Sequence, residues 1–365
     1  MTELFSRGLF RRLDWYLIGV VVLLTALGLV NLKSAGAESG IWKTQLVWLG
    51  IGFLVMLVFI WVDYNRLEFF SLVIYFLCLG FLVLVLLVGA EIHHSRAWLV
   101  FKGLRFQPSE FGKLGIILIL ARIYQRRETH KPMGLRELIY PGVVILLPAF
   151  LIALEPDLGT CLIYLIFGAG LVLFMGIKRK LLLVLILILL ALSPVCWKYV
   201  LKPHQKVRIL TFLQPEKDSL GAGYNLLQSK IAIGSGGFWG KGWQKGTQTM
   251  LRFLPEQHTD FAFSVWAEEW GFALGVVPGI LLYLLIFSRG VYIASQAKDR
   301  LGMMLSLGAV MVIFTHFLVN LAMISGCFPV VGVPLSFFSY GGSHLVLCFA
   351  LVGLLLNVSM RRYVF

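Results

Sequence analysis

The stretch KLLLVLILILLALSPVCW, Lys180 to Trp197, decides the class of fold, because it has no charged residue after its first lysine. A helix needs about 20 apolar residues to cross the hydrocarbon core of a membrane. A second run of this kind, LIGVVVLLTALGLV, extends from Leu17 to Val30. Both runs are continuously apolar and do not alternate with period two, so they predict membrane-spanning helices and not the strands of a barrel.

The composition of the whole chain also indicates an integral membrane protein. Of its 365 residues, 59% are hydrophobic and 14% are charged, and the mean hydropathy is +0.87. No small-residue cleavage site follows the first apolar run, so we expect this helix to be retained. The five cysteines are scattered and have neither metal-ligand spacing nor the spacing of a disulfide framework.

The net charge of +14 is explained by a membrane and not by nucleic acid. Lys and Arg gather in the connections on one side of the expected bundle, where Arg7, Arg11 and Lys131 are examples, and few, such as Lys102, lie on the other. By the positive-inside rule, both termini are predicted to be cytoplasmic. The same cationic connections suit anionic membrane lipid.

We therefore predict an all-α polytopic membrane protein that forms one domain, residues 1–365, with about ten transmembrane helices. The expected spans are residues 14–32, 45–62, 69–89, 108–124, 138–154, 158–176, 181–200, 260–287, 302–325 and 340–359. Residues 201–259, between the seventh and eighth spans, form a large extracytoplasmic loop. Its glycine-rich segments, GAGY and IGSGGFWGKGW, either let the backbone approach a ligand closely or make a flexible linker.

Ionisable side chains at membrane depth are costly, so each cluster of them is a candidate functional site. The first cluster lies in RFQPSEFGKLG, Arg105 to Gly115. Glu110 and Lys113 share one helix face and form either a structural ion pair or part of a site. Arg105 and Gln107, just outside the helix, suit an anionic group such as a phosphate.

The second cluster is EPDLGT, Glu155 to Thr160, in a short outer connection. Asp157 either caps the helix that follows or orients a cation or a catalytic residue.

The third cluster lies in FLPEQHTDFAFSVWAEEWGF, Phe253 to Phe272. Asp260 either caps the next helix or acts as a base. At 100° per residue, Asp260, Ser264 and Glu268 form a slowly turning polar stripe, which we expect to face a watered cavity. A carboxylate in a partly dry cavity tends to have a raised pKa, which suits a general base.

These motifs together resemble the SEDS family of shape, elongation, division and sporulation proteins. The similarity is carried by RFQPSE, EPDLGT, the loop GAGYNLLQSKIAIGSGGFWGKGWQKGTQTMLRFLPEQHTDFAF and the late FPVVGVPLSFFSYGGS, and it extends from the first span to the last. KGTQ ahead of FLPEQHTDF is similar to the elongation branch of the family. At SRAWL the chain departs from its relatives, because Arg96 lies two positions before Trp98.

The resemblance implies a peptidoglycan glycosyltransferase that polymerises lipid II at the outer face of the bacterial cytoplasmic membrane. It implies that the essential Asp of the HTDF motif is Asp260 and that the Asp of the PDLGT motif is Asp157. The polar cavity residues that it implies are Arg105, Gln107, Ser109, Glu110 and Lys113.

We expect a single inverting displacement with Asp260 as the general base. Lys113, Arg105 and either Lys230 or Arg208 are expected to stabilise the pyrophosphate that leaves. The remaining substrate-binding candidates are His258, Thr259 and Glu268. Because no Cys or His cluster is visible, no fixed metal site is expected, and Mg²⁺ or Mn²⁺ would arrive with the substrate.

The resemblance also implies a class B penicillin-binding protein, a monofunctional transpeptidase, as the partner. Lipid II, the undecaprenyl-pyrophosphate-linked glycan and membrane lipid are the other expected partners. Two alternatives stay open: a lipid II transporter (flippase), which would form no bond, and a non-catalytic scaffold of the elongation machinery. A transporter would favour a site near the midplane between repeats, whereas the charged clusters here gather on one side.

Overall fold

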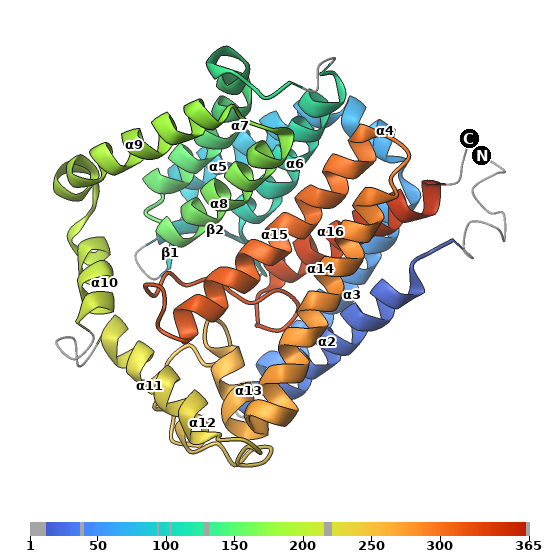
Figure 1. Cartoon of the computed structure of the whole chain (residues 1–365). Helices are drawn as coiled ribbons and strands as arrows, with labels where there is room; N and C mark the ends of the chain where they lie inside the picture. The colour runs from blue at the N-terminus through green and yellow to red at the C-terminus, as the bar shows by residue number, and fades with distance from the viewer. Residues whose placement is uncertain are drawn as a thin grey trace.

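The computed structural model describes residues 12–36, 40–92, 95–101, 104–127, 131–214 and 221–362. Arg7, Arg11 and Lys102 of the charge argument lie outside them. The described chain is mostly helical (Figure 1). The long helices are α2 (Trp15–Ala35), α3 (Ile41–Trp61), α5 (Ser71–Val88), α6 (Pro108–Gln125), α7 (Leu135–Leu154), α8 (Leu158–Met175), α9 (Arg179–Val195), α14 (Val277–Ser295), α15 (Arg300–Ile324) and α16 (Gly342–Arg361). The shorter ones are α4 (Tyr64–Phe69), α10 (Pro203–Leu213), α11 (Ala222–Ser235), α12 (Thr247–Met250), α13 (Ala262–Gly271) and the π-helical turns η2 (Cys196–Val200) and η4 (Phe272–Val276).

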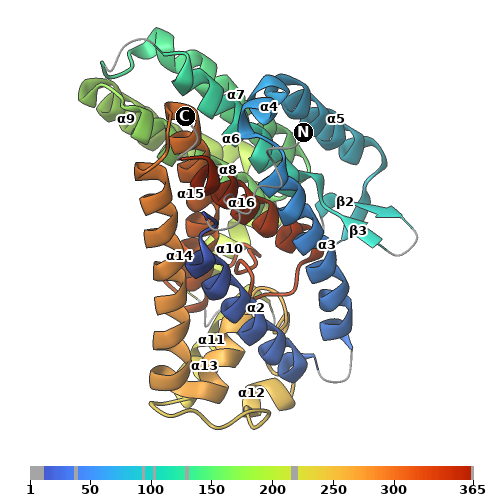
Figure 2. The same ribbon diagram turned by 90° about the vertical axis from the view of Figure 1, so that its right-hand side faces the viewer.

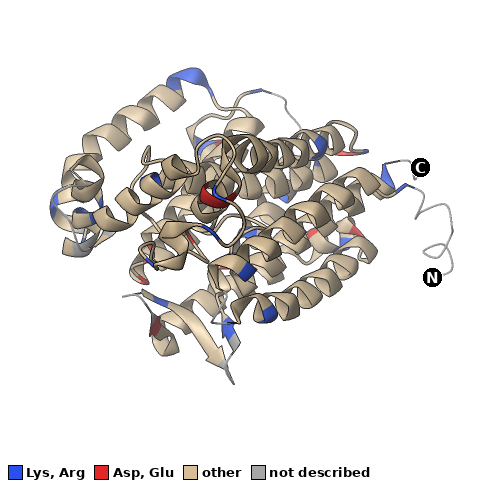
Figure 3. Cartoon of the chain, turned by 90° about the horizontal axis from the view of Figure 1, so that it is seen from below, with Lys and Arg blue, Asp and Glu red and all other residues tan. Residues whose placement is uncertain are grey.

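Nine helical stretches in the described part of the chain are long and apolar enough to cross a membrane, which confirms the predicted polytopic helical class. The fourth predicted span, residues 108–124, is not among these nine and forms helix α6. Glu110, Lys113 and Arg122 give α6 a composition that does not by itself mark a span. Helices α5 and α15 pack against it and bury its charged first turns. In Figure 3, most of the length of the helices carries no charged residue.

The two described ends of the chain meet at one end of α14. Arg289, in the last turns of this helix, makes a 2.6 Å ion pair with Asp14, which caps α2. Tyr292, on the same helix, lies beneath the guanidinium of Arg362 just after α16. The beginning and the end of the described bundle therefore lie on the same face.

Helix α16 forms the centre of the bundle, since its residues are buried along its whole length, and it packs along α3. Helix α9 is the opposite case, because none of its described residues is buried, and it stands at the edge of the molecule in Figure 1. Figure 2 shows α2 beside α14, with α11, α12 and α13 gathered at their lower ends.

A small antiparallel sheet, which the sequence did not predict, joins α5 to α6. It consists of β1 (Ala90–Ile92), β2 (Ser95–Phe101) and β3 (Leu104–Phe106) in the order β1-β2-β3. Val100 pairs with Arg105 across β2 and β3. The sheet thus fixes the backbone of Arg105 immediately before the start of α6.

The predicted loop, residues 201–259, is largely helical where it is described, because it contains α10, α11 and α12. Its residues 215–220 lie outside the described part. The helices arise where apolar residues recur between the glycines, as Leu226 and Ala232 do, both of which are buried.

The eighth predicted span, residues 260–287, consists of two helices and not one. Helix α13 ends at Gly271, whose φ of +70° interrupts the helix, and η4 and α14 follow. Trp266 Nε1 donates to the carbonyl of Gly275 over 3.0 Å, and a Cβ on Gly279 would lie 2.9 Å from the ring of Phe263. A helix rises 1.5 Å per residue, so these residues cannot meet along one straight helix. The chain therefore turns back at Gly271.

Candidate active site

Asp260 lies in the turn immediately before α13. Its backbone carbonyl accepts a 2.8 Å bond from Asn320 Nδ2, but its carboxylate has no hydrogen-bond partner among the described residues. The N-cap of α13 is Phe261 and the helix has no side-chain cap, so capping does not explain this aspartate. Thr259 bonds Glu256 and does not cap the helix either.

Burial raises the pKa of Asp260 to about 7. The neighbouring carboxylates Glu256 and Asp157 add to this rise in pKa, and Arg208 of α10 opposes it. The side chain also faces the segment after α15, because a Cβ on Gly332 would lie 3.3 Å from Asp260 Oδ2. A carboxylate with such a pKa changes its ionisation near neutral pH, a property that suits a general base.

A chain of contacts leads from Asp260 to the first predicted cluster. The backbone amide of Tyr340 donates to the carbonyl of His258 over 2.9 Å, and the two rings are 6.1 Å apart. Burial raises the pKa of Tyr340, and the nearby Arg105 guanidinium opposes the rise. Arg105, Tyr340 and the neighbouring pair His258 and Asp260 thus belong to one region, although the sequence separates these three places widely.

Asp157 joins the first and second clusters. Its carboxylate accepts from the backbone amide (3.0 Å) and the hydroxyl (2.8 Å) of Thr160, so it caps α8 as one of the two predicted alternatives states. The same carboxylate lies 3.4 Å from Gln107 Nε2. Ser109, the second residue of α6, is buried, and its carbonyl accepts from the hydroxyl of Tyr164.

Glu110 and Lys113 pair over 2.7 Å and are almost completely buried. Two histidines that the sequence analysis did not single out complete the cluster. His344 Nδ1 lies 2.7 Å from Glu110 Oε2, and His316 Nε2 lies 2.9 Å from Lys113 Nζ. Lys113 is 0% exposed, so its ammonium does not reach a substrate in this arrangement.

The ligand atoms of Glu110, His316 and His344 lie within 4.8 Å of one another, which is close enough to hold a metal ion. One carboxylate and two imidazoles are a ligand set that zinc accepts. The Lys113 ammonium, however, already donates to Glu110 Oε1 and contacts His316. A metal ion would have to displace this ammonium, so the geometry does not favour one.

Glu268 lies away from Asp260 and fastens the loop. It is 0% exposed, and its carboxylate forms a 2.7 Å ion pair with Lys241 and accepts a 3.1 Å bond from the backbone amide of Gln248. Ser264, on the same face of α13, lies 2.8 Å from Ser229 of α11. The predicted polar stripe is therefore covered by α11 and α12 and does not face a watered cavity.

The glycine-rich segment approaches a helix and not a ligand. A Cβ on Gly240, whose φ is +82°, would lie 2.3 Å from the carbonyl of Glu269. The amides of Lys241 and Gly242 donate to the last carbonyls of α13, and the amides of Phe272 and Ala273 donate to carbonyls of the loop. The loop therefore satisfies both helix ends at the Gly271 turn.

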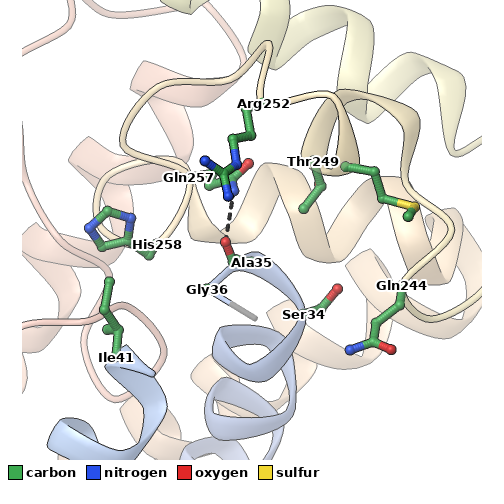
Figure 4. A pocket seen from close by; sticks show the side chains of 10 residues that line it. Ser34, Ala35, Gly36, Ile41, Gln244, Thr249, Arg252, Gln257 and His258 are labelled. Atoms are coloured by element: carbon green, nitrogen blue, oxygen red, sulfur yellow. Dashed lines mark hydrogen bonds between the residues drawn. The ribbon is translucent and has the colours of Figure 1, made fainter. Parts of the chain in front are cut away.

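A half-open pocket of about 670 Å³ lies beside His258 (Figure 4). Its lining combines apolar residues with the side chains of polar and charged ones, which include Ser34, Gln244, Thr249, Arg252 and Gln257. Gln257 closes one side by donating to the backbone carbonyl of Ala35 over 2.7 Å. Amide and hydroxyl groups of this kind suit a sugar. Lys230 lies outside the pocket, against Gly326.

Comparison with known proteins gives the family. The family described as cell cycle protein, the FtsW, RodA and SpoVE family, matches residues 8–364, and the chain belongs to it. The peptidoglycan glycosyltransferase MrdB of Escherichia coli K12 is 36% identical over 346 residues, which cover 95% of this chain and 93% of that protein. The peptidoglycan glycosyltransferase RodA of Treponema pallidum is 32% identical and covers 96% of this chain and 98% of its own.

Solved structures agree with this assignment. A chain from a structure described as "Structural coordination of polymerization and crosslinking by a peptidoglycan synthase complex" has a TM-score of 0.85 at 35% identity, and covers 97% of this chain and 99% of its own. The rod shape determining protein RodA of Thermus thermophilus has a TM-score of 0.73 at 32% identity, and covers 96% and 98% of the two chains.

Proposed function

We propose that this chain is a peptidoglycan glycosyltransferase of the bacterial cytoplasmic membrane, which polymerises lipid II into glycan strands at the outer face during cell elongation. The proposal rests on Asp260, a carboxylate that burial keeps near neutral pKa and that has no hydrogen-bond partner among the described residues. The activity named for MrdB and RodA, which match nearly the whole chain, supports it.

In the proposed reaction, Asp260 accepts the proton of the acceptor sugar hydroxyl as its oxygen attacks the anomeric carbon of the donor. The bond from that carbon to the pyrophosphate breaks as the new glycosidic bond forms, and the configuration inverts. One base is sufficient for such a displacement. A carboxylate with a pKa near 7 is a stronger base than an ordinary one, and it is about half ionised at neutral pH and more fully ionised above it.

Negative charge builds on the pyrophosphate as it leaves, and cations nearby would stabilise it. Arg105 and Arg208 are the cations of the site that act on Tyr340 and Asp260. Lys113 is too deeply buried for direct contact. Mg²⁺ or Mn²⁺ carried by the pyrophosphate would supply further positive charge without a fixed protein site.

We also propose a class B penicillin-binding protein as the partner. The support comes from the similar chain that belongs to a complex coordinating polymerisation with crosslinking. A partner of this kind would join the strands that this chain makes.

The test is polymerisation of labelled lipid II by the purified chain with its transpeptidase, using wild type, Asp260→Ala and Asp260→Asn. Both variants should lose about 10²–10⁴-fold in rate, because each lacks the base. Asp14→Asn is the control, since Asp14 is a buried carboxylate that pairs with Arg289 at the far end of α14 and lies outside the site.

Equal rates in wild type and both Asp260 variants would exclude Asp260 as the base. Absence of polymer together with movement of lipid II across liposomes would favour the transporter.

A further inference from the structure

Helix α15 carries two buried polar side chains that the proposed mechanism does not use. His316 and Asn320 are 2% and 0% exposed, and they lie four residues apart on one helix face. A polar side chain inside a membrane protein is costly to bury unless its partners satisfy it. The partners of these two residues lead to the same segment, residues 331–336.

Asn320 forms hydrogen bonds both to Asp260 and to the segment of residues 331–336. Its Nδ2 donates to the backbone carbonyl of Asp260 over 2.8 Å and to that of Val333 over 2.7 Å. Both amide hydrogens are thereby used on carbonyls from two distant parts of the chain. Asn320 therefore fixes the distance between the backbone of Asp260 and that of the segment.

His316 binds the same segment to the buried ion pair. Its Nδ1 lies 3.1 Å from the carbonyl of Pro334, which can only accept, so Nδ1 carries the hydrogen. Nε2 is then an acceptor and takes a hydrogen bond from Lys113 over 2.9 Å. The tautomer of His316 thus follows from its two partners.

The segment passes directly beside the carboxylate of Asp260. A Cβ on Gly332, whose φ is +73°, would lie 3.3 Å from Asp260 Oδ2, so only glycine fits here comfortably. At its other end, Ser336 Oγ lies 3.2 Å from Nε2 of His344, whose Nδ1 contacts Glu110. The segment is therefore held by Asn320 at Val333 and by two histidines of the Glu110 cluster at Pro334 and Ser336.

We propose that His316 and Asn320 are positioning residues, which hold residues 331–334 against Asp260 and through which the Glu110–Lys113 pair acts on the base. This inference rests on the proposed glycosyltransferase function. In this inference, the buried Glu110–Lys113 pair helps to position Asp260 and does not contact the pyrophosphate.

The first test compares Asn320→Ala with Asn357→Ala. Asn357 is a matched control, because it is equally buried and its amide also donates to backbone carbonyls, those of Phe59 and Val62. It lies near the end of α16, away from Asp260. If Asn320 only supports the fold, the two variants should lose similar thermal stability and similar activity. If it positions Asp260, Asn320→Ala should lose roughly 100-fold in kcat with little change in KM, and Asn357→Ala should not.

The second test separates the two bonds of His316. His316→Asn keeps a donor near the position of Nδ1 and can still hold Pro334, whereas His316→Gln keeps an acceptor near Nε2 and can still satisfy Lys113. If His316 positions the segment, His316→Asn should keep a higher kcat than His316→Gln. His316→Leu, which keeps neither bond, should have the lowest kcat of the three. The opposite order would mean that His316 serves only as a hydrogen-bond acceptor for the buried Lys113 ammonium, and would overturn its positioning role.

The pH profile of kcat is a readout that loss of stability alone would not move. Glu256, Arg208 and Asp157 are the charged groups that shift the pKa of Asp260. The Asn320 variant and the His316 variants leave all three in place. A carboxylate released from its place gains water, and its pKa falls, so the acid limb of Asn320→Ala should shift to lower pH. An unchanged limb and a kcat equal to that of Asn357→Ala would overturn the inference while wild type still polymerises. An inactive wild type would instead remove the proposed function and this inference with it.

Discussion

The buried and half-buried carboxylates of this chain differ in what holds them. Glu110 is neutralised by Lys113 and His344, Glu268 is held by Lys241 and the loop, and Asp157 caps a helix. Asp260 and Glu155 have none of these partners among the described residues, and of these two Asp260 is the one near the pocket residue His258 in the chain. A carboxylate that is committed to a structural bond is poorly placed to accept a proton from a substrate, so Asp260 is the residue to test as the base.

Glu155 provides a separate test of the electrostatics. It is 1% exposed, and both carboxylate oxygens lack a hydrogen-bond partner among the described residues. Burial, and then the charge of Asp157, raises its pKa to about 8. The folded chain therefore keeps this proton after the unfolded chain has released it, so stability should fall as pH rises from about 4.5 to 8.

Glu155→Gln should remove that part of the dependence on pH, because glutamine does not titrate. The measurement is the thermal unfolding midpoint in detergent at several values between pH 5 and 8, and the slope of the variant should be smaller than that of wild type. Glu91→Gln, at an exposed carboxylate, is the control and should keep the wild-type slope. A Glu155→Gln slope equal to that of wild type would contradict the raised pKa.

Single residues could be predicted from the sequence where a charge interrupts an apolar run. That rule identifies Asp260, Glu110 and Lys113 without any structure. The same rule, applied to neutral polar residues, would have drawn attention to His316 and Asn320 within the apolar run of α15. Their partners could not be predicted, because these lie in other segments and are fixed only by packing.

At the scale of elements, the turn at Gly271 determines where Asp260 lies. Because the chain reverses there, Asp260 lies beside the last turns of α15, where Asn320 binds its backbone carbonyl, and not at the tip of a spanning helix. The glycine-rich loop stabilises this reversal by pairing its backbone with both helix ends. Hydropathy predicts one span here because apolar residues continue on both sides of the turn. The positive φ of Gly271, which makes the turn, does not change the hydropathy of the sequence and so could not be detected from it.

Gly240→Ala tests this pairing. Alanine at a φ of +82° is strained by about 1–3 kcal/mol, and its Cβ would meet the carbonyl of Glu269. The expected result is a lower thermal midpoint and easier proteolysis of the loop. Gly234→Ala is the control, since a Cβ there meets nothing within 4 Å inside α11 and should stabilise that helix by about 0.5–1 kcal/mol. Equal midpoints for the two variants would show that the loop is not packed in this way.

At the scale of the whole molecule, hydropathy predicted the helical class well because each span is a local feature. The sheet before α6 and the short helices of the long loop were not predicted, since their segments are brief and their stability comes from neighbours. Helix α15 extends from the face of the bundle that carries Arg127 to the face that carries α11. Arg300, at its start, donates to the carbonyl of Arg127, and the carbonyl of Ile324, at its end, accepts from Ser229 of α11.

The 25 residues of α15 correspond to about 37 Å of helix, which is more than the ~30 Å of the hydrocarbon core. The segment around Arg127 and the segment around α11, which contact the two ends of α15, should therefore lie on opposite sides of the membrane. The arginines near α7 predict that their side is cytoplasmic. In a cysteine-free background, Leu251→Cys should react with a membrane-impermeant maleimide in intact cells, and Arg136→Cys only after permeabilisation, since both positions are exposed. Native Cys327 retained alone is the control for the outer side, because Lys230 of α11 packs against the adjacent Gly326. The reverse pattern would place Asp260 toward the cytoplasm, where a strand polymerised from lipid II could not enter the wall.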